Sequence, residues 1–301
     1  MRIAITGSTG LVGAALVEAL QAAGEEVVRL VREEASGPGQ ARWDPSSGAV
    51  DLHALGDIDA FVHLAGENVA GGRWTNARKR RIHDSRGPAT TRLCETLAEM
   101  ERPPKVLISA SATGVYGDRG DEDLDEQSSV GSPEDFLAKV AADWEEGTRP
   151  LERRGARVVH LRIGVVLAKH GGALAKMLPP FRLGLGGRLG DGKHWMSWIS
   201  LDDLVRAVQR ALADDRLRGP VLAVAPNPVT NVAFTRALGA ALRRPTILPV
   251  PRFMLRLVFG EMADMLLSSQ RAHPRRLLEA GFEFEHARLE EALRVTLQRD
   301  T

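Results

Sequence analysis

The sequence predicts an α/β fold of the Rossmann type: a doubly wound parallel sheet, with a smaller and mostly helical C-terminal region on the substrate side. Three observations lead to this prediction. A glycine-rich turn follows the first strand-like segment, short apolar segments then alternate with helical ones, and the pattern changes after about Gly164. Strands that are apolar along their whole length are typical of a parallel sheet with helices on both faces. Ligands of such sheets bind beyond the carboxyl ends of the strands.

The first half of the chain alternates strands with helices. Residues 2–6 form an apolar run, and residues 11–23 repeat apolar side chains at helical spacing until Gly24, which is a common helix end. Apolar runs at 26–31, 59–64 and 105–109 predict the next strands. The stretch 75–100 predicts a long helix with a break near Gly87 and Pro88.

The later elements follow from the same patterns. A helix over 135–154 precedes a strand over 157–161, and residues 201–214 predict a helix that Asp202 is well placed to cap. Residues 221–225 predict one more strand, and beyond Asn227 the pattern is mostly helical, ending in an amphipathic segment at 289–297. We expect a first domain over 1–228, with a substrate-side insert at about 167–196, and a helical region over 229–301.

Composition argues against several classes of protein. The chain has 301 residues, a formal net charge of +1 and 44% hydrophobic residues. It can therefore bury a large core, and its overall charge does not attract nucleic acid or an anionic membrane. The single cysteine, Cys94, lies in a helical segment, so we expect a buried thiol and no internal disulfide. With no leader, no long apolar run and no cluster at metal-ligand spacing, we expect a cytoplasmic protein without a metal, a membrane or a nucleic-acid partner.

The strongest motif is Thr6-Gly7-Ser8-Thr9-Gly10-Leu11-Val12-Gly13, which has the spacing G-x-x-G-x-x-G. Gly7 allows a tight exit from the strand, Gly10 allows the backbone to approach a pyrophosphate, and Gly13 allows close packing of the helix. A pyrophosphate binds the free N–H groups at such a helix start. Because the motif lies between a strand and a helix, it predicts that a dinucleotide is bound by Gly7, Ser8, Thr9, Gly10, Leu11, Val12 and Gly13.

The residue that follows the second strand bears on which dinucleotide is bound. Sheets that bind NAD usually carry Asp or Glu there, for the ribose 2′-hydroxyl. Here the position is held by Arg32. A guanidinium suits a 2′-phosphate and can stack on adenine, so NADP(H) is favoured over NAD(H). Glu33 and Glu34 follow directly, and a shift of one residue would present a carboxylate instead.

Four stretches resemble the extended, epimerase-like branch of the short-chain dehydrogenase/reductase superfamily. They are the glycine turn, Val62-His63-Leu64-Ala65-Gly66, Ser109-Ala110-Ser111-Ala112-Thr113-Gly114-Val115-Tyr116-Gly117 and Trp198-Ile199-Ser200-Leu201-Asp202-Asp203-Leu204. More narrowly, the chain is similar to an atypical "epimerase family", which carries patterns like Arg73-Trp74-Thr75, Ser85-Arg86 and Leu266-Leu267-Ser268-Ser269-Gln270.

This resemblance implies a Rossmann-type domain that binds a nicotinamide cofactor, with the C-terminal part closing over a substrate. It also implies positions for the rest of the cofactor. Leu64, Ala65 and Gly66 would lie along its adenosine side, and Ser109 would face the nicotinamide.

The catalytic pattern of that superfamily, Tyr-x-x-x-Lys with a serine or threonine, is incomplete here. Tyr116 is the only tyrosine, and no lysine follows it at this spacing. If Lys139 is the motif lysine, Asp135 stands at the tyrosine position, where its reference pKa of about 4 makes it a poor replacement for a tyrosine. The remaining candidates are Ser111 or Thr113 to polarise a carbonyl, Tyr116 to donate a proton and Lys139 to bind the ribose.

Four residues are candidates for contacts with a small-molecule substrate. Glu67 and Asn68 follow the strand at 59–64, and Arg188 and Trp198 lie in or just after the glycine-rich segment 184–192. A cation with an aromatic ring would suit an anionic or planar substrate.

The sequence leaves three classes of function open. The first is an NADP(H)-dependent oxidoreductase or epimerase/dehydratase with a modified proton-transfer site. The second is a nicotinamide-nucleotide-binding protein with little or no turnover, such as a redox or nucleotide sensor. The third is a protein that keeps the fold for its surface, and fold alone does not choose among them.

Overall fold

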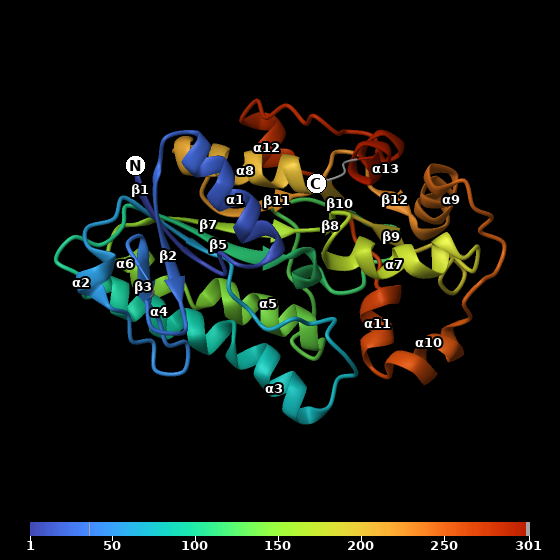
Figure 1. Ribbon diagram of the computed structural model, residues 1–301. Coiled ribbons are helices and arrows are strands. Elements are labelled where there is room, and N and C mark those ends of the chain that lie inside the picture. Colours follow the sequence, from blue (N-terminus) through green and yellow to red (C-terminus); the bar gives the residue numbers. More distant parts are fainter. Residues whose placement is uncertain (36, 299–301) are drawn as a thin grey trace.

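The computed structural model describes residues 1–35 and 37–298. Its centre is a seven-stranded parallel sheet with the order β11-β7-β5-β4-β1-β2-β3 (Figure 1). The strands are β1 (Arg2–Thr6), β2 (Glu26–Val31), β3 (Gln40–Arg42), β4 (Ala60–His63), β5 (Val106–Ala112), β7 (Arg157–Ile163) and β11 (Gly219–Ala223). The chain fills the sheet outward from β1 in one direction and then from β4 in the other. The crevice for a ligand is therefore expected at the carboxyl ends of β1 and β4.

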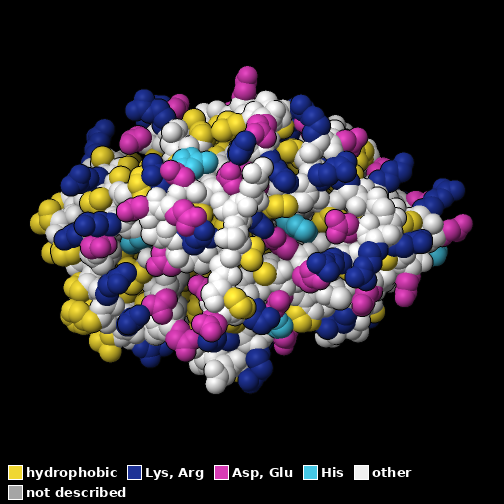
Figure 2. Space-filling model, turned by 180° about the vertical axis from the view of Figure 1, so that it is seen from behind, with side chains coloured by type: hydrophobic (Ala, Val, Ile, Leu, Met, Phe, Trp, Pro, Cys, Tyr) yellow, Lys and Arg dark blue, Asp and Glu magenta, His cyan; other side chains and the backbone are white. Residues whose placement is uncertain are grey.

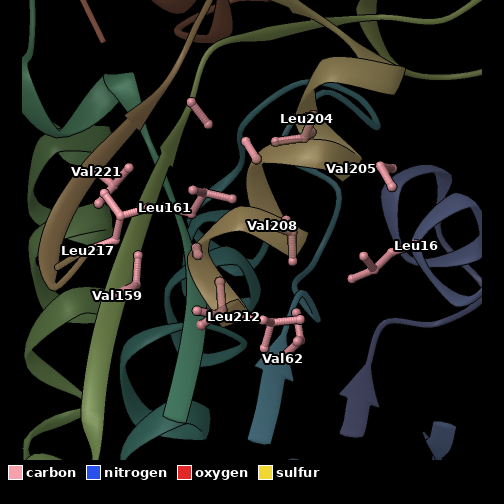
Figure 3. Close-up of a cluster of buried hydrophobic side chains, with 14 of the residues drawn as sticks. Leu16, Val62, Val159, Leu161, Leu204, Val205, Val208, Leu212, Leu217 and Val221 are labelled. Atoms are coloured by element: carbon pink, nitrogen blue, oxygen red, sulfur yellow. The ribbon is translucent and has the colours of Figure 1, made fainter. Parts of the chain in front are cut away.

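Helices cover both faces of this sheet, which confirms the doubly wound α/β fold. One face carries α1 (Leu11–Ala22), α8 (Leu201–Ala213) and α12 (Arg275–Glu279), and the other carries α2 (Leu52–Leu55), α4 (Gly87–Ala98), α5 (Phe136–Glu146) and α6 (Arg149–Arg153). Figure 3 shows how α8 meets the first face, with Leu204, Val208 and Leu212 directed toward Val62 and Leu161 of the strands. All five side chains are buried, so this contact is dry packing of the kind that stabilises a core.

The C-terminal part has a core of its own, built partly from the insert. Buried side chains of α7 (Gly172–Arg182), α9 (Asn231–Leu242) and α13 (Leu289–Gln298) pack together around Trp198. A smaller cluster joins α10 (Arg252–Phe259) to α11 (Met262–Leu267). The remaining elements are α3 (Asn76–Asp84), η1 (Thr113–Tyr116), β6 (Asp123–Leu124), β8 (Val165–Leu167), β9 (Trp195–Met196), β10 (Trp198–Ser200), β12 (Val229–Thr230) and β13 (Arg271–Ala272). Three short sheets, β10-β8, β12-β9 and β13-β6, link them. The boundary at residue 228 stays a prediction.

Several predicted elements differ from the structure in their limits. The helix predicted over 75–100 is divided into α3 and α4, near the expected break, and the helix over 135–154 is divided into α5 and α6. The strand predicted over 105–109 continues to Ala112, and β3 and α7 were not predicted. The cap of α8 is also different: Ser200, not Asp202, is the N-cap, and its hydroxyl oxygen accepts from the Asp203 amide. Ser200 has the extended backbone that a cap needs, whereas Asp202 is already inside the helix.

The surface mixes both signs of charge, as a net charge of +1 suggests. In the view of Figure 2, dark blue and magenta side chains alternate over most of the face, and hydrophobic side chains gather at the lower left, the side on which α10 lies. The exposed apolar residues of α10 include Phe253, Leu257 and Val258. In the described part of the chain, no helix is both long enough and apolar enough to cross a membrane.

Candidate functional site

At two positions of the first turn, the fold of the protein, independent of any ligand, requires glycine. Gly7 has a φ of +69°, which favours glycine, and a Cβ on it would lie 2.9 Å from the carbonyl carbon of Leu64. A Cβ on Gly13 would lie 2.1 Å from the carbonyl oxygen of Gly7. Helix α1 can therefore approach the turn this closely only because Gly13 has no side chain.

Gly10 is different, because nothing in its own backbone demands glycine. Its φ of −77° and ψ of 171° suit any residue, and a Cβ would meet only the Gly7 oxygen, at 3.2 Å. Gly10 is also the N-cap of α1, and no side chain caps this helix end. The amide groups of its first turn are thus available to a ligand, and such donors with the positive end of the helix dipole suit a phosphate. The missing Cβ of Gly10, with only one protein atom near its place, and the uncapped helix start fit the pyrophosphate of a dinucleotide.

At the carboxyl end of β2, one of the two carboxylates that follow Arg32 has a protein partner. Arg32 is the first residue after the strand and is exposed. Glu34, by contrast, pairs with Arg42 of the neighbouring strand β3, at 3.0 Å. The Glu34 carboxylate is therefore directed to the edge of the sheet, while Arg32 and Glu33 are both exposed at the strand end, and Arg32 as the group that meets the ribose stays a prediction.

The end of β4 is tied to the glycine turn by a buried histidine. His63 Nδ1 lies 2.7 Å from the Thr6 hydroxyl, and His63 Nε2 lies 2.9 Å from the Thr90 hydroxyl. The Thr6 oxygen accepts from the amides of Leu64 and Ala65, so its own proton is directed to Nδ1, and the ring proton then sits on Nε2 and is donated to Thr90. Burial, assisted by the charge of Arg86, lowers the pKa of His63 to about 3. His63 is thus a neutral clamp and not a base.

Two of the catalytic candidates, Ser111 and Tyr116, are hydrogen-bonded to protein groups, which argues against the predicted catalytic roles. Ser111 donates to the carboxylate of Glu145 at 2.7 Å. The same carboxylate receives Nε and Nη2 of Arg162, at 2.8 and 2.9 Å, in a bidentate pair. Tyr116 is fully buried, donates to the Asp125 carbonyl and accepts from Arg162 Nη1 at 2.9 Å.

The electrostatics of this cluster favour its structural role. Burial opposes the ionisation of Glu145, but the hydrogen bonds and charge of Arg162 hold its pKa below the usual range. Burial raises the pKa of the Tyr116 hydroxyl. Both partners of Tyr116 are protein groups, so its proton is not presented to a substrate.

Two further predicted site residues are buried and hydrogen-bonded within the protein, which argues against their predicted contacts. Ser109 was expected at the nicotinamide, but it is fully buried and its hydroxyl is directed to the Ala110 carbonyl, at 3.4 Å. The reason is that β5 runs three residues further than predicted, so the end of this strand is at Ala112, with Thr113 next. Trp198 was expected at the substrate, but it too is fully buried, and its indole donates to the Asn227 carbonyl at 3.0 Å.

At the start of α5, where the superfamily places its tyrosine and lysine, the polar side chains also interact with neighbouring protein groups. The Asp135 carboxylate caps the helix by accepting from the amides of Leu137 and Ala138. Lys139 is exposed, and its ammonium lies 2.6 Å from Asp143, which also accepts from His83. Asp135 therefore does not replace the missing tyrosine, while a role for Lys139 toward a ribose stays a prediction.

The loop after β4 connects the Rossmann domain to the C-terminal part. Arg73 donates to the last carbonyls of α10, Leu257 and Val258, and Lys79 of α3 pairs with Glu261 at 2.7 Å. Lys176 of α7 donates to the Ala70 carbonyl. The C-terminal elements therefore hold the loop that forms one side of the crevice.

The other substrate candidates lie in exposed or half-buried positions. Glu67 is half-buried, 3.7 Å from Arg78, and Asn68 uses its side-chain oxygen to accept from the Ala70 amide. Arg188 is exposed and donates to the Asp191 carbonyl at 2.7 Å. None of these three is buried away from a ligand, so their contacts with a substrate stay predictions.

From the sequence, Arg86 was identified only as part of the Ser85-Arg86 family pattern and was given no role in the site; it lies between α3 and α4. Its guanidinium carbon stands 4.8 Å from the centre of the Trp144 ring, and a Cβ on Gly66 would lie 3.1 Å from the same carbon. Burial lowers the pKa of Arg86 to about 10. A signal was present, since Arg86 interrupts the predicted helix beside Gly87 and Pro88, but only the fold brings it to the end of β4.

A parallel sheet of this order, with a glycine turn at its switch point, defines a nucleotide-binding protein of the short-chain dehydrogenase/reductase type. The chain belongs to the NAD dependent epimerase/dehydratase family, whose family model matches residues 3–225. A second model, described as Domain of unknown function (DUF1731), matches residues 250–295.

The relatives extend over the full chain. The epimerase family protein Mb2239 of Mycobacterium bovis is 48% identical over 292 residues, covering 97% of this chain and 96% of the relative. Epimerase family protein YfhF of Bacillus subtilis is 36% identical and covers 97% of both. The crystal structure of the human epimerase family protein SDR39U1 with NADPH is 35% identical, has a TM-score of 0.90 and covers 99% of this chain and 100% of that one. The nucleoside-diphosphate sugar epimerase from Corynebacterium glutamicum is 40% identical, with a TM-score of 0.79, and covers 97% of this chain and 57% of that one.

Proposed function

We propose that this chain binds NADP(H) in the crevice between β1 and β4, and that it turns over the carbonyl and sugar-nucleotide substrates typical of its superfamily slowly or not at all. Binding is supported by the missing side chain of Gly10 at the glycine turn, by the uncapped start of α1, and by Arg32 at the end of β2. The human relative that was crystallised with NADPH supports the same cofactor.

One observation carries the second half of the proposal. Three of the polar side chains near the expected catalytic position already have protein partners: Ser111 donates to Glu145, Tyr116 lies between Asp125 and Arg162, and Asp135 caps α5. NADPH, when bound, supplies a hydride, but reduction of a carbonyl also requires a proton for its oxygen. Without a free acid at this position, the protein can hold the cofactor yet contributes little to proton transfer.

A second candidate is an NADP(H)-dependent oxidoreductase or epimerase/dehydratase with a modified site. Two observations favour it. Thr113 stands at the end of β5 with no hydrogen bond from its hydroxyl within the described residues, so it could polarise a carbonyl. The contacts of Arg73 and Lys79 also place α10 and the start of α11 beside the crevice. Such a covering element is what an enzyme needs in order to exclude water from its active site.

The test is to measure binding and turnover on the same preparation. NADPH is titrated into the protein by fluorescence, and its oxidation by a panel of carbonyl compounds and nucleotide sugars is then followed by absorbance. We expect saturable NADPH binding, oxidation close to the rate without protein, and unchanged NADPH affinity in Ser111→Ala and Tyr116→Phe. A saturable rate that Thr113→Val removes would instead establish the second candidate, and a protein that binds no NADPH would overturn both.

A further inference from the structure

Arg86 is a half-buried arginine whose guanidinium packs between an aromatic ring and a glycine backbone. Its guanidinium is half-buried between the ring of Trp144, 4.8 Å from the guanidinium carbon, and the backbone of Gly66, whose Cβ position lies 3.1 to 3.4 Å from three guanidinium atoms. Gly66 follows β4 by two residues and is exposed. The guanidinium of Arg86 therefore lies next to the carboxyl end of β4, at the expected crevice.

The hydrogen bonds of Arg86 leave one edge of the guanidinium without a protein acceptor. Its Nη1 donates over long distances to the Ile82 carbonyl, at 3.3 Å, and to the Ser85 hydroxyl, at 3.4 Å. Within the residues that the structure describes, Nε and Nη2 donate to no acceptor, and no carboxylate lies within ion-pair distance of Arg86. The Nε and Nη2 protons form the parallel pair with which arginine binds a carboxylate or phosphate side-on.

The neighbouring charges do not neutralise this cation. Glu67 acts on it only from a distance, and its carboxylate lies 3.7 Å from Arg78 instead. His63 is neutral at physiological pH, since its pKa is about 3. The indole N–H of Trp144 is buried and also has no acceptor in the described chain. A partly desolvated positive charge whose counter-charge, Glu67, is not in contact with it is costly unless a ligand supplies a closer one.

We propose that the Nε–Nη2 edge of Arg86 binds an oxyanion, a carboxylate or a phosphate, that enters the crevice at the end of β4. The inference rests on the proposed NADP(H) site, because the same strand end borders it. The oxyanion can come from two sources: a phosphate of the dinucleotide, or an anionic group of the substrate held beside it. In either case Arg86 is a recognition residue that sets which ligands the crevice accepts.

The first arm of the test measures the cofactor. Kd values for NADPH and NADH are determined for the parent, Arg86→Gln, Arg86→Lys and the matched control Arg80→Gln, which removes an exposed arginine of α3. If the oxyanion is the pyrophosphate, Arg86→Gln weakens both nucleotides about tenfold or more. If it is the 2′-phosphate, only NADPH is weakened. Arg86→Lys, which keeps the charge but not the fork, falls between the parent and Arg86→Gln.

The second arm measures the substrate side. Malonate and inorganic phosphate are titrated, at constant ionic strength, into the NADPH-saturated protein and into the free protein, while the arginine Nε–H resonances are followed by NMR. The resonance absent from Arg86→Gln should shift saturably in the parent and in Arg80→Gln if the oxyanion belongs to the substrate. The titration of the free protein keeps this arm valid even if NADPH does not bind and the proposed function fails.

One combined result overturns the inference. In this result, the Arg86→Gln protein is folded by circular dichroism and binds both nucleotides with the parent's Kd. In addition, every arginine Nε–H resonance that malonate or phosphate shifts in the parent is still present in Arg86→Gln. Arg86 would then serve only to pack against Trp144.

Discussion

Replacing Gly10 with alanine should separate ligand binding from folding, and replacing Gly13 with alanine should do the reverse. At Gly10 the backbone angles are open to alanine, and the new Cβ would meet a single atom, the Gly7 oxygen, at 3.2 Å. At Gly13 the new Cβ would lie 2.1 Å from that oxygen and 2.9 Å from the Ser8 Cα. Both contacts at Gly13 are with backbone, which cannot move without displacing the turn.

The expected magnitudes follow from these distances. Gly10→Ala should change the free energy of unfolding by no more than about 1 kcal/mol, since the loss of glycine entropy in the unfolded chain offsets the small shift needed to relieve one 3.2 Å contact with the Gly7 oxygen. Its NADPH Kd should rise at least tenfold, or about 1.4 kcal/mol, because the methyl group occupies the place of the pyrophosphate. Gly13→Ala should lose about 1–3 kcal/mol of stability through overpacking.

The assay is a pair of measurements on each variant: urea denaturation for stability and NADPH fluorescence titration for affinity. The reasoning is refuted if Gly10→Ala binds NADPH as tightly as the parent, because the space beside Gly10 would then not be the phosphate site. It is equally refuted if Gly13→Ala is as stable as the parent, since the turn would then not be as closely packed as the structure has it.

Three further outcomes are expected. Arg32→Glu should weaken NADPH at least tenfold while changing NADH little, and equal losses for both nucleotides would exclude the 2′-phosphate assignment. Glu145→Ala should lower the unfolding free energy by about 3–5 kcal/mol in urea, because it leaves Arg162 buried without a counter-charge; a loss below about 1 kcal/mol would contradict this. The pKa of His63 is about 3 in the folded chain against 6.5 in the unfolded one, so protons bind the unfolded state, and stability is full above pH 6.5 and falls below it. Between about pH 7 and pH 5 the parent should lose about 2 kcal/mol more than His63→Asn, and parallel pH profiles for the two proteins would show that His63 is not buried in its neutral form.

The fold was predictable because its signals are local. The apolar runs that form β1 and β2, the helical spacing of α1 and the glycines between them are all read from neighbouring residues. The same is true of Arg32, whose place follows from the end of β2. Element limits were less accurate: β5 continues past Ser109 because its last residues pair with β7 across the sheet, and such pairing leaves no mark in the local pattern.

The candidate site was only partly predictable, because the partner of a polar side chain is a long-range property. Ser111 and Tyr116 have the right chemistry for catalysis, but their partners lie 34 and 46 residues away, at Glu145 and Arg162. Arg86, conversely, stood in the sequence only as part of the Ser85-Arg86 family pattern, and the approach of Gly66 and Trp144 makes it a site residue.

By itself, then, the sequence determined the layered sheet, the glycine turn and the absence of a tyrosine before Lys139, because spacing along the chain specifies backbone conformation and residue identity. The tertiary structure alone decided which hydroxyl groups are hydrogen-bonded within the protein, which charges are paired there, and which polar groups remain available to a ligand. The reason is physical: hydrogen bonds and ion pairs depend on distance in space, and burial changes their strength only after the chain has brought distant segments together.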